Sequence, residues 1–348
     1  MKQDSVQVSG AIGVDLGDRT SRVCVLDGGG VVVEEATIPT SRSSFARKFA
    51  MLERARIVLE TGTHANWVHD LLVKQGHEVI VANARKVRAI STNERKCDEL
   101  DARMLARLGR VDPALLQPVT VRAEQQRLDL AVIRARATLV EARTQLVNSV
   151  RGLAKTCGER LASCSAASLH KQELNEALRP ALLRLMKVLE QISKSIAEYD
   201  KQIVELCKTR YPQTLLLTQV KGVGELTALC FVLTIGDVTR FKDGRRVGAY
   251  FGMVPGRDQS GGSDPQLRIS KTGDRMMRTL LVQCAHHILG HRGVDSDLRR
   301  FGEKLTGRGG KSAKKRAVVA TARKLAVLLF ALLRSGEVYE PLRNSAKS

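Results

Sequence analysis

The sequence predicts a mixed α/β domain at the N-terminus, followed by a mostly helical remainder. Short runs rich in β-branched residues, bounded by Gly and Asp, predict strands over residues 11–16, 21–26, 30–38, 55–59 and 78–81. The first three strands should form an antiparallel meander, and helices should separate the later ones, an order typical of an α/β sheet. Beyond the prolines that follow this region, apolar residues recur at spacings of three and four, which indicates long helices. The helices expected inside the first domain cover residues 43–52, 66–75 and 96–108.

The charge balance of the chain predicts a polyanionic partner. Its 348 residues include 57 Lys and Arg against 36 Asp and Glu, a formal net charge of +21. Such an excess is typical of proteins that bind nucleic acid. Aromatic residues make up only 3% of the chain, which argues against reading single-stranded bases by stacking and favours contacts to phosphates and duplex shape. The expected partner is structured nucleic acid.

The cysteines and the chain ends indicate where the protein acts. Seven cysteines are scattered without a CxxC pair or a cysteine and histidine cluster of zinc spacing, which predicts reduced thiols. Residues 1–10 lack the apolar core of a signal peptide, and the apolar run over residues 325–333 is too short to span a bilayer. We therefore expect a cytoplasmic protein with no membrane segment.

Four acidic residues occupy positions where α/β sheets keep their sites. Asp15 and Glu60 end two predicted strands, and Asp98 and Asp101 lie three residues apart on one face of the next long helix. Each has an ordinary interpretation: a turn aspartate, a capping carboxylate, or an acidic first helical turn offset by an arginine such as Arg103. Together they form a set of oxygen ligands suited to Mg²⁺, and two such ions assist phosphoryl transfer.

Two long helices are predicted in the middle of the chain. Residues 124–153 carry one apolar stripe, and residues 182–206 carry a sharper one whose spacing alternates between three and four. The second stripe predicts a coiled-coil seam, either between subunits or inside a helical hairpin, and we slightly favour the subunit contact. The expected division of the chain is residues 1–115, 116–212 and 213–348. The seam consists of Leu182, Leu185, Leu189, Ile192, Ile196, Tyr199, Ile203 and Leu206.

A Gly-Val-Gly sequence separates two apolar helices in the last third of the chain. Gly222 and Gly224 resemble the turn of a helix-hairpin-helix, whose backbone N–H groups hold a phosphate at the N-terminus of the second helix. An ordinary turn between helices is an equal alternative, because a lone Gly-x-Gly is a weak signal.

The loop within residues 251–278 combines a serine, several glycines and three cations. Ser260 lies in its Gly-rich part, with Arg257, Arg268 and Lys271 in the same loop. Glycines allow a backbone to approach a ligand closely, and the cations would offset phosphate charge. A serine there can attack phosphorus if a base or metal removes its proton. The alternative interpretation is that serine and glycine simply form a turn.

Two basic segments complete the predicted nucleic-acid contacts. One is the connector before the acidic helix, and the other is the tail over residues 299–324, which holds ten Lys or Arg and one acid, Glu303. Residues 306–316 should be a flexible basic loop leading to an amphipathic helix over residues 317–333. A run so one-sided favours nucleic-acid binding over a merely solvated face. The cations concerned are Arg85, Lys86, Arg88, Arg308, Lys311, Lys314, Lys315 and Arg316.

With these features assembled, the chain resembles the DEDD transposases of the insertion-sequence one-ten family, relatives of the Piv and MooV invertases. The motifs GVDLGD, VLETGTH, CDELDARMLA, VKGVGELTA, AYFGMVPGRDQSGG and RISKTGD recur in that order over nearly the whole chain. The resemblance implies a RuvC-like (RNase H-like) first domain in which Asp15, Glu60, Asp98 and Asp101 are the metal set. It also implies a coiled-coil segment and a C-terminal transposase domain whose Ser260 attacks DNA and forms a covalent link.

The same resemblance implies partners and an activity. A structured bridge RNA would pair with target and donor DNA, which fits the charge and the scarcity of aromatics. The expected protein is a Mg²⁺-dependent, RNA-guided transposase in a prokaryotic cytoplasm, associated with the nucleoid when active and assembled as a dimer or tetramer. The alternatives are a RuvC-like junction endonuclease that uses water, an RNA-independent site-specific invertase, and a non-catalytic packaging protein.

Overall fold

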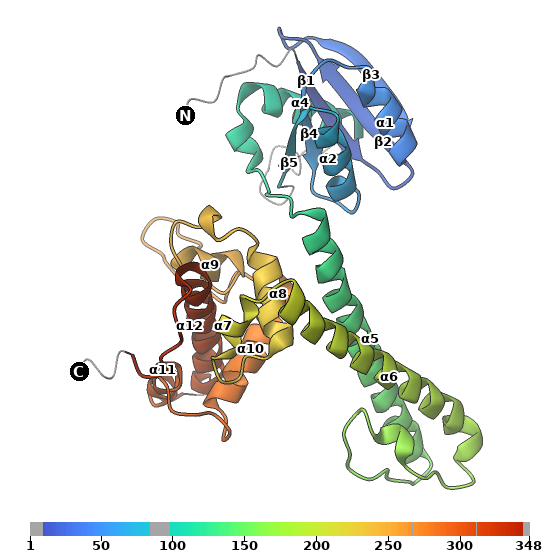
Figure 1. Cartoon of the computed structure of the whole chain (residues 1–348), viewed down its shortest axis with the longest axis vertical. Helices are drawn as coiled ribbons and strands as arrows, with labels where there is room; N and C mark the ends of the chain where they lie inside the picture. The colour runs from blue at the N-terminus through green and yellow to red at the C-terminus, as the bar shows by residue number, and fades with distance from the viewer. Residues whose placement is uncertain (1–9, 84–97, 266, 311, 344–348) are drawn as a thin grey trace. The chain divides into compact units, whose positions relative to one another are not determined.

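The computed structural model of the chain describes residues 10–83, 98–265, 267–310 and 312–343, with the backbone alone for residues 98–99 (Figure 1). It contains two compact units, Met1–Arg122 and Ala123–Ser348. The predicted α/β beginning and helical remainder are confirmed in these two units. Four cations named above lie outside the described residues: Arg85, Lys86, Arg88 and Lys311.

A five-stranded mixed sheet forms the centre of the first unit, in the order β3-β2-β1-β4-β5. The first three strands pair antiparallel as the predicted meander, whereas β1 pairs parallel with β4 and β4 with β5. Parallel pairing requires crossover connections, and the chain supplies them between β3 and β4 and between β4 and β5. The strands are β1 (Ala11–Leu16), β2 (Thr20–Leu26), β3 (Val32–Pro39), β4 (Arg56–Glu60) and β5 (Glu78–Ala82).

Helices cover the two faces of this sheet differently. On one face, α1 (Arg42–Ala50) and α2 (Ala65–Lys74) bury a core that includes Phe45 and Phe49, both fully buried. On the other face lies α4 (Asp98–Val111), followed by the 3-10 turn η1 (Pro113–Leu116). Alternate residues of each strand therefore face different helices, so the register of the sheet decides which side chains meet α4.

The second unit consists of helices and short turns. A long pair, α5 and α6, is joined to a bundle whose core contains Phe231, Phe251 and Phe330 (Figure 1). The long helices are α5 (Glu124–Thr156) and α6 (Arg179–Thr209). The others are α7 (Thr214–Thr218), α8 (Glu225–Ile235), α9 (Arg245–Tyr250), α10 (Arg275–Leu289), α11 (Asp297–Thr306) and α12 (Ala313–Ser335), with the 3-10 turns η2 (Leu169–Lys171) and η3 (Val238–Arg240).

The predicted seam on α6 packs against α5 of the same chain. Near one end of the pair, Leu182 and Leu189 share a buried cluster with Val150 and Ala154. Near the other end, Ile203 shares the bundle core with residues of α5. The preference for a subunit contact is therefore corrected for these buried positions, which an internal hairpin occupies. A supercoiled form of the pair stays a prediction.

The basic tail is more helical than expected. Helix α12 begins at Ala313, so Lys314, Lys315 and Arg316 form its exposed first turn and do not belong to a flexible loop. Ala313 is buried, and the Arg316 N–H already donates to the Ser312 carbonyl oxygen at 2.9 Å. Alanine, lysine and arginine all favour helix, which explains the earlier start.

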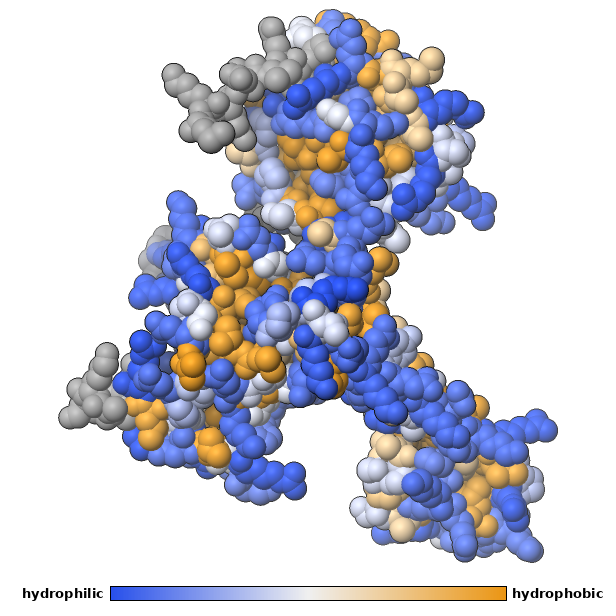
Figure 2. Space-filling model, viewed as in Figure 1, coloured by the Kyte–Doolittle hydropathy of each residue, from blue (hydrophilic) through white to orange (hydrophobic). Residues whose placement is uncertain are grey.

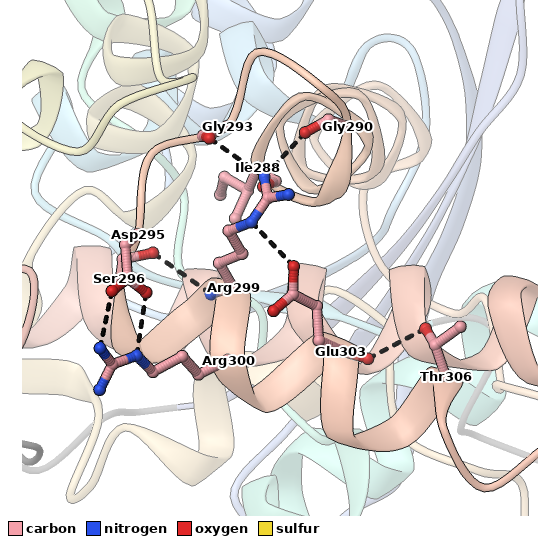
Figure 3. Close-up of polar contacts among 10 residues, drawn as sticks. Ile288, Gly290, Gly293, Asp295, Ser296, Arg299, Arg300, Glu303 and Thr306 are labelled. Carbon is pink, nitrogen blue, oxygen red and sulfur yellow. Dashed lines mark hydrogen bonds and ion pairs between the residues drawn. The ribbon is translucent and has the colours of Figure 1, made fainter.

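One arginine holds the turn between α10 and α11. Arg299 Nη1 donates to three carbonyl oxygens, those of Ile288 (3.0 Å), Gly290 (2.7 Å) and Gly293 (3.1 Å) (Figure 3). Its Nε lies 2.8 Å from Glu303 Oε1 on the next turn of α11. Because one charged donor holds three carbonyl oxygens of the turn together, this contact fixes the direction in which α11 leaves the turn.

A buried carboxylate joins the start of α5 to the end of α6. Asp129 is only 4% exposed and accepts hydrogen bonds from Arg210 Nη1 (2.7 and 2.8 Å), Tyr211 Oη (2.7 Å) and Gln125 Nε2 (3.2 Å). Burial raises the pKa of Asp129, but the hydrogen bonds from Tyr211, Arg210 and Gln125 outweigh it and hold the pKa below its ordinary value. Burial and the Asp129 contact raise the pKa of Tyr211. The ionised carboxylate is thus the form that stabilises the hairpin.

We predict that Asp129→Asn lowers the free energy of unfolding by about 1–3 kcal/mol at neutral pH, because the buried Tyr211 hydroxyl and the half-exposed Arg210 guanidinium lose a charged acceptor. The matched control is Asp200→Asn, since Asp200 accepts from Arg136 at 2.7 Å between the same helices but is 48% exposed. Its expected effect is below about 1 kcal/mol. Urea unfolding of the three proteins measures both.

The pH dependence of this effect follows from the lowered pKa. The folded pKa of Asp129 lies below the unfolded value of about 3.9, so its stabilisation is present above about pH 4 and is lost as the pH falls through the folded pKa. Wild type and Asp129→Asn should therefore converge in stability as the pH is lowered from about 5 towards 2. An equal difference at both ends of that range would contradict the assignment.

Candidate active site

Two predicted site residues lie side by side where neighbouring parallel strands end. In the register of β1 and β4, Val14 pairs with Leu59, so Asp15 and Glu60 follow at equivalent positions. Val14 and Leu59 belong to the core under α1 and α2. Because strand residues alternate between faces, Asp15 and Glu60 lie on the opposite face, the one that α4 covers. Both side chains are partly exposed, as a site open to a ligand requires.

The direction of α4 brings its acidic end to the same edge. A Cβ built at Gly13 would lie 1.9 Å from the Ala102 carbonyl oxygen, so the helix rests directly on β1 there. Near its other end, Arg110 Nη1 donates to the Gly28 carbonyl oxygen in the β2–β3 turn at 3.1 Å. The helix therefore runs opposite to β1, and its N-terminal turns, which contain Asp101, lie towards the edge where β1 ends.

Three of the four predicted acids thus share one face and one edge of the first unit. Asp101 is 8% exposed, immediately before the contact of Ala102 with the sheet. Asp98 begins α4 one turn earlier, and its side chain lies outside the described atoms. Among the described side chains no three acidic, histidine or cysteine residues form a ready-made metal cluster. The donor set still fits a hard divalent cation, because every candidate ligand is a carboxylate oxygen.

Two arginines lie on the same face. Arg103, expected as a partner for the acids, makes a salt bridge with Glu35 of β3, with Nε and Nη2 at 3.0 and 2.7 Å from one carboxylate oxygen. Arg22 pairs with Asp15 across the β1–β2 ladder, so it faces α4 as well. The sequence analysis missed Arg22. Its position could have been predicted from the antiparallel meander, because residues paired across two strands lie on the same face of the sheet.

Ser260 lies at the tip of a short β-ribbon. The backbones of Ser260 and Ser263 bond in both directions, at 3.3 and 3.1 Å, around Gly261 and Gly262. Gly261 has φ +56°, a conformation that favours glycine in tight hairpin turns. The serine is exposed, so its hydroxyl faces solvent. The turn interpretation is correct for the backbone, and it leaves the side chain accessible for chemistry.

The ribbon is fastened at its base to the helical bundle. Its arms pair from Gly256 to Arg268 (2.8 Å) and from Gly252 to Lys271 (2.9 Å). Lys271 adopts φ +56°, unusual for a residue with a side chain, which fixes the direction in which the chain enters α10. Arg257, Arg268 and Lys271 all lie along the ribbon, with Arg257 and Lys271 exposed and Arg268 at its paired arm. The structure thus places the three predicted cations on one ribbon with Ser260.

The predicted helix-hairpin-helix turn lies between α7 and α8. Gly222 has φ +99°, and a Cβ there would lie 3.0 Å from His287 Nδ1 on α10. Gly224 precedes the first residue of α8, makes no side-chain cap, and has open space where a Cβ would point. The first N–H groups of α8 are therefore sterically approachable from that side.

Four of the basic tail residues predicted to bind nucleic acid are described and exposed. Arg308 precedes α12, and Lys314, Lys315 and Arg316 extend from its first turn. Figure 2 shows a mostly hydrophilic surface on the visible side of the second unit, with smaller hydrophobic areas between. Among the described helices, none combines the length and apolar character that a membrane crossing requires.

Comparisons with known proteins agree over both units. Residues 12–157 match the profile of DEDD transposases of the IS110 type, described as "Transposase", and residues 214–300 match "Transposase IS116/IS110/IS902 family". The transposase for insertion sequence element IS1111A of Coxiella burnetii is 30% identical over 341 residues, covering 94% of this chain and 90% of that protein.

Two further relatives extend the comparison. The transposase for insertion sequence element IS1328 of Yersinia enterocolitica is 25% identical over 335 residues, covering 94% of this chain and 98% of its own length. A probable family 20 transposase of Pseudomonas aeruginosa is 32% identical over 234 residues, covering 64% of this chain and 68% of that protein. By class, then, the two units make up a transposase, an enzyme that cuts and joins DNA. The chain belongs to the IS116/IS110/IS902 family of insertion-sequence transposases.

The glycine turn yields a stability prediction with an internal control. Gly222→Ala should lower the free energy of unfolding by about 1–3 kcal/mol, because alanine disfavours φ +99° and its methyl group would press on His287. Gly224→Ala should change it by less than about 1 kcal/mol, since its φ of −96° suits any residue and its Cβ would meet open space. Thermal and urea unfolding compare the pair, and equal effects of the two substitutions would contradict the account.

Proposed function

We propose that this transposase recombines DNA with Mg²⁺ held at the edge formed by β1, β4 and α4, and with Ser260 as the nucleophile. The observation that supports the proposal most directly is the placement of Asp15, Glu60 and Asp101 on one face and towards one edge of the sheet, although they lie far apart in the sequence. The transposase class makes a phosphodiester the substrate.

Asp15, Glu60, Asp98 and Asp101 are the proposed ligands, enough for two ions. Bound Mg²⁺ would lower the pKa of an attacking hydroxyl and stabilise the negative charge on the departing oxygen. Within this arrangement the carboxylates orient the scissile phosphate against the edge of the sheet, and the buried position of Asp101 limits its movement. The RuvC-like assignment of this domain belongs to the same proposal.

Ser260 is proposed to form a covalent link with DNA. Its hydroxyl loses a proton, the Oγ atom bonds to phosphorus, one P–O bond of the DNA breaks, and the released oxygen takes up a proton. A second DNA hydroxyl then reverses the exchange and joins a new strand. Arg257, Arg268 and Lys271 lie on the same ribbon and would bind the phosphates beside the serine. The exposed turn supports this role because a buried serine has no access to DNA.

The proposed partners follow from the charge. A net charge of +21 with few aromatic residues suits binding of target DNA, donor DNA and a structured bridge RNA through their backbones. Base pairing by the RNA would then select the DNA sequence. Assembly as a dimer or tetramer and action at the nucleoid complete the proposal.

Paired serine variants test the nucleophile. Ser260→Ala should reduce strand cleavage and joining by at least about 10³-fold, whereas Ser263→Ala should stay near wild type, because Ser263 joins the same turn through backbone bonds that alanine retains. Wild type trapped on a nicked suicide substrate should carry DNA on Ser260, located by peptide mass spectrometry.

The same assay separates the alternatives. Strand hydrolysis that persists in Ser260→Ala would support a junction endonuclease that uses water. Asp101→Asn should abolish recombination while DNA binding persists, since removing a negative charge does not weaken attraction to phosphate. Full activity in EDTA would overturn the metal assignment. Recombination by protein freed of RNA would favour an RNA-independent invertase, and RNA that copurifies can be sequenced directly.

The basic start of α12 is tested by salt dependence. Replacing Lys314, Lys315 and Arg316 with glutamine should weaken nucleic-acid binding and flatten the plot of log K against log salt by up to about 0.9 for each duplex phosphate that the variant no longer neutralises. All three side chains are exposed, so folding should be retained. Replacement of Arg179, Lys187 and Lys194 on α6 removes the same charge elsewhere and serves as control. Equal slopes for the two triple variants would assign no specific contact to α12.

A further inference from the structure

Arg22 occupies a position on the sheet that no part of the proposed chemistry has used. It is the direct partner of Asp15 in the antiparallel ladder of β1 and β2. Residues on either side of it, Ser21 and Val23, are buried, and Val23 faces the core under α1 and α2. Arg22 therefore faces α4, beside the edge where Asp15, Glu60 and Asp101 meet, and it is partly exposed.

A polar groove opens beside this arginine. Its volume is about 210 Å³, and its walls include Arg22 and Thr37 from the sheet and Ala102 from α4. Arg22 Nη1 donates to Oγ1 of Thr37, its ladder partner on β3, which directs the guanidinium across the sheet towards β3. Glu35, also in the wall, is already engaged by Arg103. The groove thus lies over β2 and β3, on the α4 face of the sheet, and Arg22 supplies a cation to its wall.

The ligand that best fits a guanidinium at this position is a phosphodiester. The planar set of N–H donors on the guanidinium matches the oxygens of a phosphodiester, and the guanidinium stays charged at every accessible pH. A nucleic-acid strand whose phosphate lies at the acidic edge presents its next phosphates at regular intervals along the backbone. A strand that continues from that edge across β2 would pass Arg22, which lies opposite Asp15, whereas the exposed cations of α1 are on the other face of the sheet.

We propose that Arg22 binds a backbone phosphate of the DNA strand that enters the acidic edge, a phosphate adjacent to the one at which the strand is cut. The inference rests on the proposed function of that edge and adds to it a substrate contact that aligns the strand across β2. Arg22 touches substrate but takes no part in proton transfer. Its removal should therefore weaken binding and raise KM more than it lowers kcat.

The test combines a substitution at Arg22 with neutralisation of one DNA phosphate and asks whether their effects on binding are additive. DNA probes carrying the terminal sequence of the encoding element receive one neutral methylphosphonate at each position near the cut, and binding is measured in EDTA with Ca²⁺ added back in parallel. Wild type should bind about tenfold more weakly when one particular position is modified, about 1.4 kcal/mol. Arg22→Ala should show the same tenfold weakening on unmodified DNA and no further weakening at that position. Arg22→Lys should recover part of the affinity.

The control is Arg47→Ala, which removes the same charge from an exposed site on α1, behind the sheet. Its small effect on the binding free energy should add to the effect of a methylphosphonate at every position. If Arg22→Ala is additive at all positions too, or if it lowers the unfolding temperature and weakens all probes equally, Arg22 has a structural role and the proposal fails. The proposed function is tested separately. If Asp101→Asn cleaves DNA as fast as wild type, the metal site is rejected. The coupling between Arg22→Ala and a methylphosphonate position is measured by DNA binding and does not depend on cleavage.

Discussion

The contact of α4 with β1 at Gly13 is the constraint on which the first unit depends. Any side chain at this position would collide with the backbone of α4, since a Cβ would lie 1.9 Å from the Ala102 carbonyl oxygen and 2.5 Å from the Ala106 nitrogen. The facing helix residues are alanines for the same reason. This close approach sets both the height and the register of α4 on the sheet. The position of Asp101 relative to Asp15 and Glu60 follows from that register.

In the second unit, a frame of helices carries the exposed ribbon that contains Ser260. The backbone N–H groups of Gly252 and Met253, at the base of the ribbon that carries Ser260, donate to the Ala249 and Gly248 carbonyl oxygens of α9 at 2.8 and 2.9 Å. Arg299 satisfies three carbonyls and so orients the turn into α11, and Asp129 joins the long hairpin at its base. Arg299 and Asp129, each with several hydrogen bonds, thus connect neighbouring helices of the unit, whereas other cations remain exposed on its surface.

The two units divide the proposed chemistry between them. The acidic residues proposed as metal ligands lie in residues 1–122, and Ser260 with its neighbouring cations lies in residues 123–348. Arg22 adds a cation inside the acidic region, where it would let a phosphate strand approach carboxylates that otherwise repel it. A transposase must bind DNA strongly yet keep a cluster of acids beside it. A mixture of both charges on the α4 face meets that requirement.

The sequence by itself determined the element order, the family and the candidate residues, because these depend on local patterns. Strand periodicity located the meander, and the charge count predicted nucleic acid. Local sequence patterns did not predict features that depend on which segment packs against a helix. The stripe on α6 has the same spacing whether it meets another subunit or α5. Only the tertiary structure decided that Asp15, Glu60, Asp101 and Arg22 share one face, because strand pairing and the contact at Gly13 join segments far apart in the chain.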